Sequence, residues 1–131
     1  MATAGIMNDP VSENIIACAY KVYNTLGFGF LEKVYENSMA VELRKARIRF
    51  DQQARITVYY EEVNVGDYEA DLYVDKQIIV ELKSVQQLIE KHEVQLVHYL
   101  KATKKDIGLL INFGPDGVDV RRKFKDYTRQ D

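Results

Sequence analysis

The stretch ADLYVDKQIIVELKS, residues 70–84, decides the fold because it alternates like two buried strands joined by a short turn. One face of this predicted hairpin is apolar and comprises Ala70, Leu72, Val74, Ile78, Val80 and Leu82. The other face carries charge, from Glu69, Asp71, Glu81 and Lys83. Charged residues in a segment that otherwise resembles protein core need a reason, and the pairing of the strands supplies one.

The register of the hairpin follows from keeping one face apolar. A two-residue turn would mix apolar and charged side chains on both faces. A connection of residues 75–77 instead pairs Val74 with Ile78, although no glycine is present where such loops favour one. This register places Asp71 opposite Glu81 and Glu69 opposite Lys83.

Asp71 and Glu81 are thus predicted to be cross-strand neighbours, with Cβ atoms about 4.5–5.5 Å apart. Two carboxylates at that distance repel, and one of them has a raised pKa unless a cation lies between them. Mg²⁺ and Mn²⁺ favour such oxygen ligands. Lys83 can then neutralise charge or orient or deprotonate a water molecule, which completes a minimal set for metal-assisted phosphodiester hydrolysis.

Two helices are predicted before the strands. The first covers about 10–26, where Asp9 can cap its start and Gly27 suits its end. The second covers roughly 30–46 and has an inward stripe of Tyr35, Met39, Leu43 and Ala46. Glu32 lies three residues before Tyr35 and extends this stripe. Glu36 and Glu42 lie off it and are expected to be solvated.

The remaining pattern predicts strands at 54–60, 67–74 and 77–84, a helix at roughly 85–103, and strands at 107–113 and 118–124. Ser84 with Gln87 forms a capping-box pattern for that helix, on which His92, Gln95 and Tyr99 align. The element order is ααβββαββ, which indicates an α+β fold with a mixed sheet.

Length and composition fit a soluble globular chain. The 131 residues suit one domain, 1–131, in which residues 1–8 form a flexible N-terminal arm. A net charge of −2 excludes a strongly basic protein, so nucleic-acid binding would need local basic patches and a metal. The single cysteine, Cys18, falls among apolar helix residues and is expected to be buried. We expect no signal peptide, no membrane span and a cytoplasmic location.

Four motifs together resemble a known family. Asp71, a spacer of nine residues and the triplet Glu81-Leu82-Lys83 resemble the PD-(D/E)xK nuclease superfamily. GFLEKVY, with Gly29, Glu32 and Tyr35, is similar to the signature of the GxxExxY protein family within that superfamily. QLVHY, with Gln95 and Tyr99, resembles the QxxxY motif of the RecB-like branch, and LLINFG also resembles the family. Ala70 stands where the superfamily is named for a proline.

The resemblance implies a restriction-endonuclease-like fold and roles for individual residues. Asp71, Glu81 and the Leu82 carbonyl would bind Mg²⁺ or Mn²⁺, and Glu32 would reach the metal directly or through water. Lys83 would position or polarise the attacking water. Gln95 and Tyr99 would support the site or touch nucleic acid. The implied partner is nucleic acid, DNA rather than RNA, and small nucleases of this architecture often form homodimers.

Each residue also has a simpler interpretation. Asp71, Glu81 and Lys83 could form a structural salt-bridge cluster, and Gln95 and Tyr99 could be ordinary helix residues; solvent exposure, however, does not explain Glu32 on an apolar stripe. His92 is expected to be a surface histidine. Tyr35 could pack in the core or lie near nucleic acid.

The densest basic run is Arg121, Arg122, Lys123 and Lys125, which is either a solvated strand end or a source of phosphate contacts. Lys101, Lys104 and Lys105 form a second basic candidate. Two functions remain at this stage. One is a metal-dependent nuclease, and the other is a non-catalytic module that keeps the nuclease fold to bind nucleic acid or a protein. The first predicts loss of cleavage on removal of Asp71, Glu81 or Lys83, and the second predicts binding without metal or turnover.

Overall fold

Five strands form one sheet in the order β1-β2-β3-β4-β5 in the computed structural model, which describes residues 9–126. Only the β3–β4 pair is parallel, so the sheet is mixed, as predicted. The strands are β1 Phe50–Tyr60, β2 Val63–Val74, β3 Ile78–Lys83, β4 Ile107–Gly114 and β5 Gly117–Phe124. The helices are α2 Pro10–Leu26, α3 Glu32–Lys45 and α4 Glu90–Thr103. The predicted order ααβββαββ is therefore confirmed; the predicted arm, residues 1–8, lies outside the described residues.

The ends of α2 are set by local chemistry. The Asp9 carboxylate accepts a hydrogen bond from the Val11 N–H, and Pro10 occupies the first turn, where its missing N–H costs nothing. Gly27 closes the helix with a φ of 69°, a conformation that glycine adopts without strain. Both ends are where the sequence predicts them.

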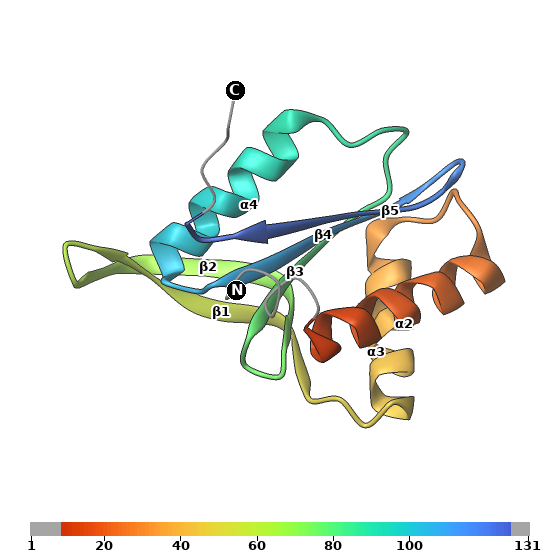
Figure 1. The fold of residues 1–131 in the computed structure, drawn as a ribbon, viewed down its shortest axis with the longest axis horizontal. Helices are drawn as coiled ribbons and strands as arrows, with labels where there is room; N and C mark the ends of the chain where they lie inside the picture. The colour runs from red at the N-terminus through yellow and green to blue at the C-terminus, as the bar shows by residue number, and fades with distance from the viewer. Residues whose placement is uncertain (1–8, 127–131) are drawn as a thin grey trace.

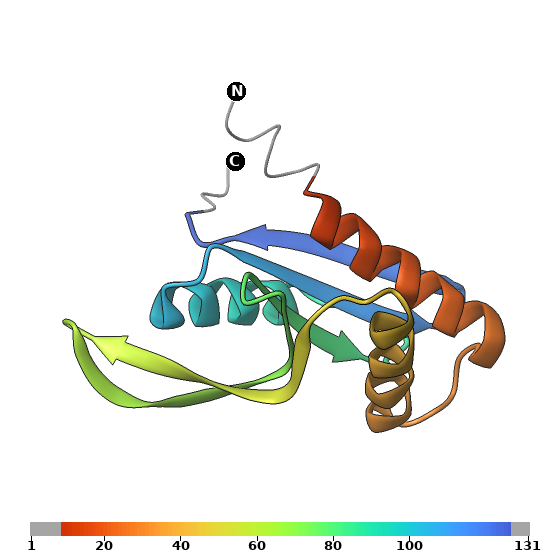
Figure 2. The ribbon, with the colours of Figure 1, turned by 90° about the horizontal axis from the view of Figure 1, so that it is seen from below.

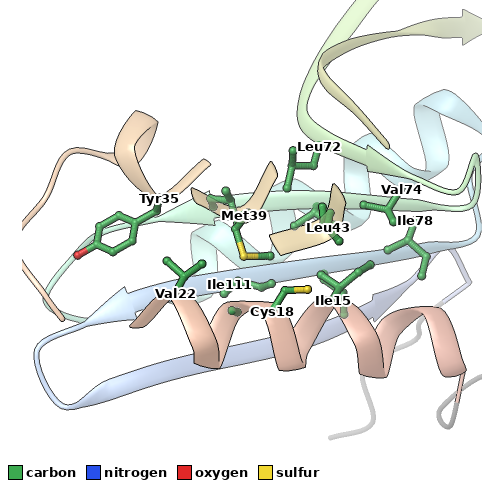
Figure 3. Packing of buried hydrophobic residues seen from close by; sticks show 14 of the residues in the cluster. Ile15, Cys18, Val22, Tyr35, Met39, Leu43, Leu72, Val74, Ile78 and Ile111 are labelled. Atoms are coloured by element: carbon green, nitrogen blue, oxygen red, sulfur yellow. The ribbon is translucent and has the colours of Figure 1, made fainter. Parts of the chain in front are cut away.

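Helices α2 and α3 cover one face of the sheet, and α4 covers the other. Between α2, α3 and the sheet lies a cluster of buried side chains that includes Ile15, Cys18, Met39, Leu43 and Ile111 (Figure 3). The burial of Cys18 agrees with the prediction from the sequence. A second cluster packs under α4 and comprises Ile56, Tyr68, Ala70, Ile79, Leu88, Leu96, Leu100 and Leu110. Two separate apolar cores therefore sandwich the strands that carry the predicted site.

The β2–β3 hairpin has the predicted register. Val74 pairs with Ile78 and Leu72 pairs with Val80, across a connection of residues 75–77. Asp75 and Lys76 both adopt positive φ, so this turn is built without the glycine that usually supplies that conformation. The ladder between β2 and β3 ends at Leu72, however, and Glu69 pairs with Arg55 of β1. The predicted pairing of Glu69 with Lys83 is wrong.

Within the β1–β2 hairpin, the apolar side chains of β2 pass from one face of the sheet to the other. Gln53 has a φ of 48°, and the register passes from the Gln52–Leu72 pair to the Ala54–Ala70 pair with Gln53 between them. Leu72 packs in the cluster under α2 and α3, whereas Ala70 packs under α4. Strict alternation predicts both on one face. Asp71 occupies the position at which β2 changes sides.

The far end of this hairpin extends beyond the other strands, on the side away from α2 and α3 (Figures 1 and 2). Its connection, Glu61-Glu62, joins Tyr60 to Val63 with positive φ at both glutamates. The hairpin is longer than predicted, because β1 begins at Phe50 and β2 at Val63. No helix among residues 9–126 is long and apolar enough to span a membrane.

Helix α4 begins at Glu90, five residues later than predicted. The buried Asn112 side chain donates to the Val85 carbonyl and accepts from the Val85 N–H, at 2.9 Å in each case. Ser84 donates to the Phe30 carbonyl instead of capping a helix. The first turn of α4 is capped by His92, whose Nδ1 accepts from the Ile89 N–H. The predicted capping box at Ser84 and Gln87 is therefore wrong, because a long-range contact holds residues 84–89 in a loop.

Candidate active site

Asp71 links β2 to β3 through its side chain. Its Oδ2 accepts a hydrogen bond from the Leu82 N–H at 2.8 Å. The backbone pairing of β2 with β3 ends at the Leu72–Val80 pair. The Leu82 N–H therefore has no backbone partner on β2, and the Asp71 carboxylate accepts its hydrogen bond instead. Its Oδ1 lies 3.4 Å from the side-chain nitrogen of Gln53. Asp71 is thus fixed between β1 and β3 and is half-buried.

Glu81 lies beside Asp71 and is the most perturbed acid of the site. Burial, followed by the negative charge of Asp71, raises the pKa of Glu81 to about 8. The Tyr68 hydroxyl donates to its Oε1 and opposes part of that rise. The Glu81 carboxyl therefore keeps its proton near neutral pH, unless a cation takes the place of the proton.

An aromatic bridge connects Glu81 to α4. The ring of Tyr68 stacks on Tyr99 with centroids 3.9 Å apart, and Gln95 donates to the Tyr99 hydroxyl at 3.1 Å. Burial, with the charge of Glu81, raises the pKa of Tyr68, so the phenol stays protonated and continues to donate. Gln95 and Tyr99 therefore reach the site through Tyr68. Tyr68 is two residues before Ala70, so alternation along the predicted strand 67–74 places it on the apolar face and gives no signal for this contact.

Lys83 is half-buried at the end of β3. Residues two apart on a strand point to the same side, so Lys83 shares a face with Glu81. Among residues 9–126 its ammonium forms no hydrogen bond or ion pair, so it remains available for a ligand. The next residue, Ser84, donates to the Phe30 carbonyl at 2.9 Å and brings the start of α3 to this end of β3.

Two of the three glutamates of α3, Glu32 and Glu36, exchange the environments predicted for them. Glu32 is exposed, so the expectation of a carboxylate within the apolar stripe is wrong. It is the first residue of α3, where the helix extends past the core. Glu36, predicted to be solvated, is 3% exposed. Ala46, predicted to continue the stripe, is exposed just after the last helical residue.

Glu36 connects α3 to the site through β1. Its two oxygens accept from the side-chain amides of Gln52 and Gln53 at 2.7 and 2.6 Å, and Lys33 forms an ion pair with it. Gln53 also contacts Asp71. The path from Glu36 through Gln53 to Asp71 was missed from the sequence, because Gln52 and Gln53 come from a distant segment. The available sequence signal for this path was the pair of adjacent glutamines, Gln52 and Gln53, just before the predicted strand 54–60.

Several predicted residues lie elsewhere. Tyr35 is fully buried, stacks on Phe113 with centroids 4.4 Å apart, and donates to the Gly27 carbonyl. A ring without exposed surface cannot touch nucleic acid, so that predicted contact is wrong and the packing interpretation holds. Glu69 is exposed. His92 caps α4, as described above.

The basic run of β5 is held by carboxylates. Arg121 forms ion pairs with Asp119 and Glu93, and Lys123 lies 2.7 Å from Glu93. Arg122 forms an ion pair with Glu13 of α2. The Arg121 guanidinium holds the pKa of Asp119 below its usual range. These contacts join β5 to α4 and α2, which gives the run a structural role.

The donor set suits a hard divalent cation. Among the described residues, no group of three or more histidine, cysteine, aspartate or glutamate side chains gathers at metal-binding spacing. The carboxylates of Asp71 and Glu81, with the Leu82 carbonyl, offer oxygen ligands only. Mg²⁺ commonly binds through one or two carboxylates and keeps several waters, so this small set fits it.

Comparisons with known proteins give a family and a fold. The family model of the PD-(D/E)XK nuclease superfamily matches residues 9–124. A search of curated proteins gave no match. Among solved structures, "Crystal structure of SSO0001" is similar with a TM-score of 0.57 and 15% identity, over 73% of this chain and 52% of that chain. The present chain thus spans about half the length of SSO0001. At this identity the likeness concerns the fold alone, which is α+β and restriction-endonuclease-like.

Proposed function

The chain belongs to the PD-(D/E)XK nuclease superfamily, and we propose that it is a divalent-metal-dependent nuclease that hydrolyses phosphodiester bonds. Its principal substrate is DNA rather than RNA. The observation that supports this proposal most is the meeting of Asp71 and Glu81 between adjacent strands, with Lys83 on the same face of β3. Nucleases of this superfamily generally use such carboxylates to bind a divalent cation.

We also place the chain in the GxxExxY group and the RecB-like branch. Gly29 has a φ of 119°, which favours glycine, and Tyr35 anchors the loop before α3 by hydrogen bonding to Gly27. These two residues of the motif support the position of the third, Glu32. Gln95 and Tyr99 support Glu81 through Tyr68. Tyr35 thus fixes the loop before α3, and Gln95 and Tyr99 support the Tyr68–Glu81 contact.

The residues divide the chemistry as follows. Asp71, Glu81 and the Leu82 carbonyl would hold Mg²⁺ or Mn²⁺, and Glu32 would reach the cation directly or through water. A bound divalent cation lowers the pKa of water and stabilises charge on the phosphoryl oxygens. Lys83 orients the attacking water and adds positive charge beside the phosphate. Tyr68 and Tyr99 keep the Glu81 carboxylate in place and exclude water from one side.

Cleavage assays with two matched variants test the proposal. Labelled linear, single-stranded, branched and supercoiled DNA, and RNA, are incubated with Mg²⁺, Mn²⁺ or EDTA. Asp71→Asn and Glu69→Gln each remove one negative charge from β2, two residues apart, but only Asp71 is in the site. We expect Asp71→Asn to lower the metal-dependent rate by at least about 100-fold, since it removes a ligand, and Glu69→Gln to cleave like the wild type.

Equal cleavage by Asp71→Asn and the wild type would refute the assignment of the site. Absence of cleavage on every substrate, together with absence of Mn²⁺ binding by calorimetry, would leave a non-catalytic module with a nuclease fold. Lys83→Ala gives an independent check, because it should abolish cleavage and leave Mn²⁺ binding in place. Retained cleavage by this variant would remove Lys83 from the mechanism.

A further inference from the structure

A groove along β1 is lined by more cations than carboxylates. Three neighbouring hollows share Tyr73 in their walls and run from the end of α3, along the edge of β1, to the end of α4. We call this hollow the β1 groove. Its cations are Arg44, Arg49, Arg55, Lys76 and Lys105.

The cations of the β1 groove outnumber its acids. Asp51 and Asp75 are the only carboxylates that line it, against five cations, in a chain whose net charge is −2. Within residues 9–126, none of the five forms an ion pair with a carboxylate. The cations of β5, in contrast, are neutralised by Asp119, Glu93 and Glu13. The β1 groove therefore offers an anionic ligand five cations that are not neutralised by carboxylates, unlike the basic run of β5.

Aromatic rings hold two of these cations in place. The Arg44 guanidinium lies 5.2 Å from the centroid of the Phe50 ring, and the Lys105 ammonium lies 5.4 Å from that of Tyr73. Such contacts orient the side chains without cancelling their charge. They also cover a face of each ring, which leaves less aromatic surface for stacking bases. The groove therefore suits the phosphates of a strand better than its bases.

The β1 groove leads to the candidate active site. Tyr73 of its wall follows Asp71 by two residues on β2, a distance of about 6–7 Å along a strand. Gln52 lines the groove, and the next residue, Gln53, contacts Asp71. The walls of the β1 groove are thus continuous, along β2 and β1, with the residues that hold Asp71.

We infer that the β1 groove binds the phosphodiester backbone of a nucleic-acid strand and guides it to Asp71 and Glu81. This inference rests on the proposed nuclease function for the direction of the strand, but the binding itself needs no metal. Single-stranded DNA, duplex DNA and RNA share the phosphodiester chemistry. Recognition through phosphates predicts binding that depends on salt and not on base sequence.

Fluorescence anisotropy in EDTA tests the groove with 30-nucleotide single-stranded DNA, the corresponding duplex and RNA of the same sequence. The groove variant is Arg55→Gln with Lys105→Gln. The matched control is Lys21→Gln with Lys45→Gln, which removes the same charge from exposed lysines that pair with Glu42. We expect the groove variant to bind at least tenfold more weakly. Its slope of log affinity against log salt should be shallower by roughly 1.4–1.8, the value for two lost phosphate contacts.

The control should bind within twofold of the wild type. A second groove variant, Arg49→Gln with Lys76→Gln, should lose affinity to a similar extent, and it decides the case if the first variant fails to fold by circular dichroism. Equal loss in the groove and control variants would overturn the inference. So would loss only in Arg121→Gln with Lys123→Gln, or wild-type protein that binds none of the three ligands.

These experiments distinguish a failure of the groove inference from a failure of the proposed nuclease function. Groove-dependent binding by a protein that cuts no substrate would support the groove and refute the nuclease. Cleavage that needs Asp71, with unchanged affinity and rate in both groove variants, would support the nuclease and refute the groove. The ligand that loses most affinity in the groove variants identifies the class of strand that the groove takes.

Discussion

Glu32 and Glu36 lie one turn apart in α3, yet they meet different surroundings. Glu36 is enclosed by Gln52, Gln53 and Lys33, and each of its oxygens accepts more than one hydrogen bond. Glu32 is exposed at the first turn, beside the loop that Ser84 binds. Glu36 is therefore placed to position β1, whereas Glu32 is free to contact a ligand.

The pair makes a test in which stability and activity separate. Glu36→Ala removes a buried carboxylate that accepts from the half-buried amides of Gln52 and Gln53 and from Lys33, and we expect it to lower the free energy of unfolding by about 2–3 kcal/mol. Glu32→Ala should change stability by less than about 0.5 kcal/mol, as is usual at the surface, yet reduce metal-dependent cleavage. Urea unfolding followed by circular dichroism measures the first effect. Equal destabilisation by both variants would contradict the assignment of these two environments.

The failure to foresee Glu36 has a physical cause. Periodicity marks the face of a helix that apolar side chains share, and it assigns a carboxylate to solvent when it lies off that stripe. The burial of Glu36 depends on amides that reach it from β1, 16 and 17 residues later. Hydrogen-bond partners from another element cannot be read from the spacing within one helix.

The segment between β3 and α4 shows the same dependence at the scale of elements. Ser84 and Gln87 satisfy a local rule for starting a helix, but Asn112 of β4 binds both backbone groups of Val85. Satisfying a strand-end N–H and C=O inside the protein outweighs a cap that solvent can replace. Helix α4 consequently starts at Glu90, which sets where Gln95 and Tyr99 meet the sheet.

Asn112→Ala should loosen this connection. The variant leaves the Val85 N–H and C=O without their partner, and we expect a loss of about 2–3 kcal/mol in the free energy of unfolding. Hydrogen exchange at Val85 should accelerate more than at residues of α2. Ser84→Ala is the matched control, since it removes one exposed bond to Phe30 and should cost less than about 1 kcal/mol. Unchanged exchange in Asn112→Ala would show that the loop does not depend on this contact.

Elements whose signals are local were predicted well. Asp9, Pro10 and Gly27 define α2 by themselves, and the pairing of Val74 with Ile78 follows from keeping the β2–β3 hairpin apolar on one face. The change of face at Gln53 was not predicted. It needs a residue with positive φ inside a strand, and glutamine carries no sequence signal for that conformation. Asp71 and Glu81 were identified as neighbours, but Tyr68, which belongs to the α4 side after this change, was missed.

At the scale of the whole molecule, the sheet places a carboxylate pair between two apolar cores. Asp71 lies where β2 passes from the α2 and α3 core to the α4 core, and Glu81 is held under Tyr68 and Tyr99. Such a location excludes water from charged groups, which is unfavourable unless a proton or a cation compensates. Ionising the carboxylate pair without a bound cation therefore lowers the free energy of unfolding of the whole domain.

The pH dependence of the free energy of unfolding measures this effect of ionising Glu81. The pKa of Glu81 is about 8 in the folded protein and near 4.5 in an unfolded chain. Between these values the folded state keeps a proton that the unfolded state has released, so unfolding becomes easier as pH rises. The contribution of Glu81 is fully present below about pH 4.5 and is lost as pH passes through 8. Glu81→Gln keeps a neutral group throughout, and we expect its stability to fall less between pH 5 and 8.

Urea unfolding in EDTA at pH 5, 6, 7 and 8 compares the two proteins, and every other titrating group is common to both. Mn²⁺ should then stabilise the wild type more at pH 8 than at pH 6, because cations bind the ionised carboxylate and protons compete with them. Glu81→Gln should gain much less from Mn²⁺ at either pH. Parallel stability curves for the two proteins in EDTA would mean that Glu81 is ionised in the metal-free fold. In that case a charge other than Mn²⁺ or a proton must balance the carboxylate pair, and Lys83, on the same face of β3, would be the first residue to replace.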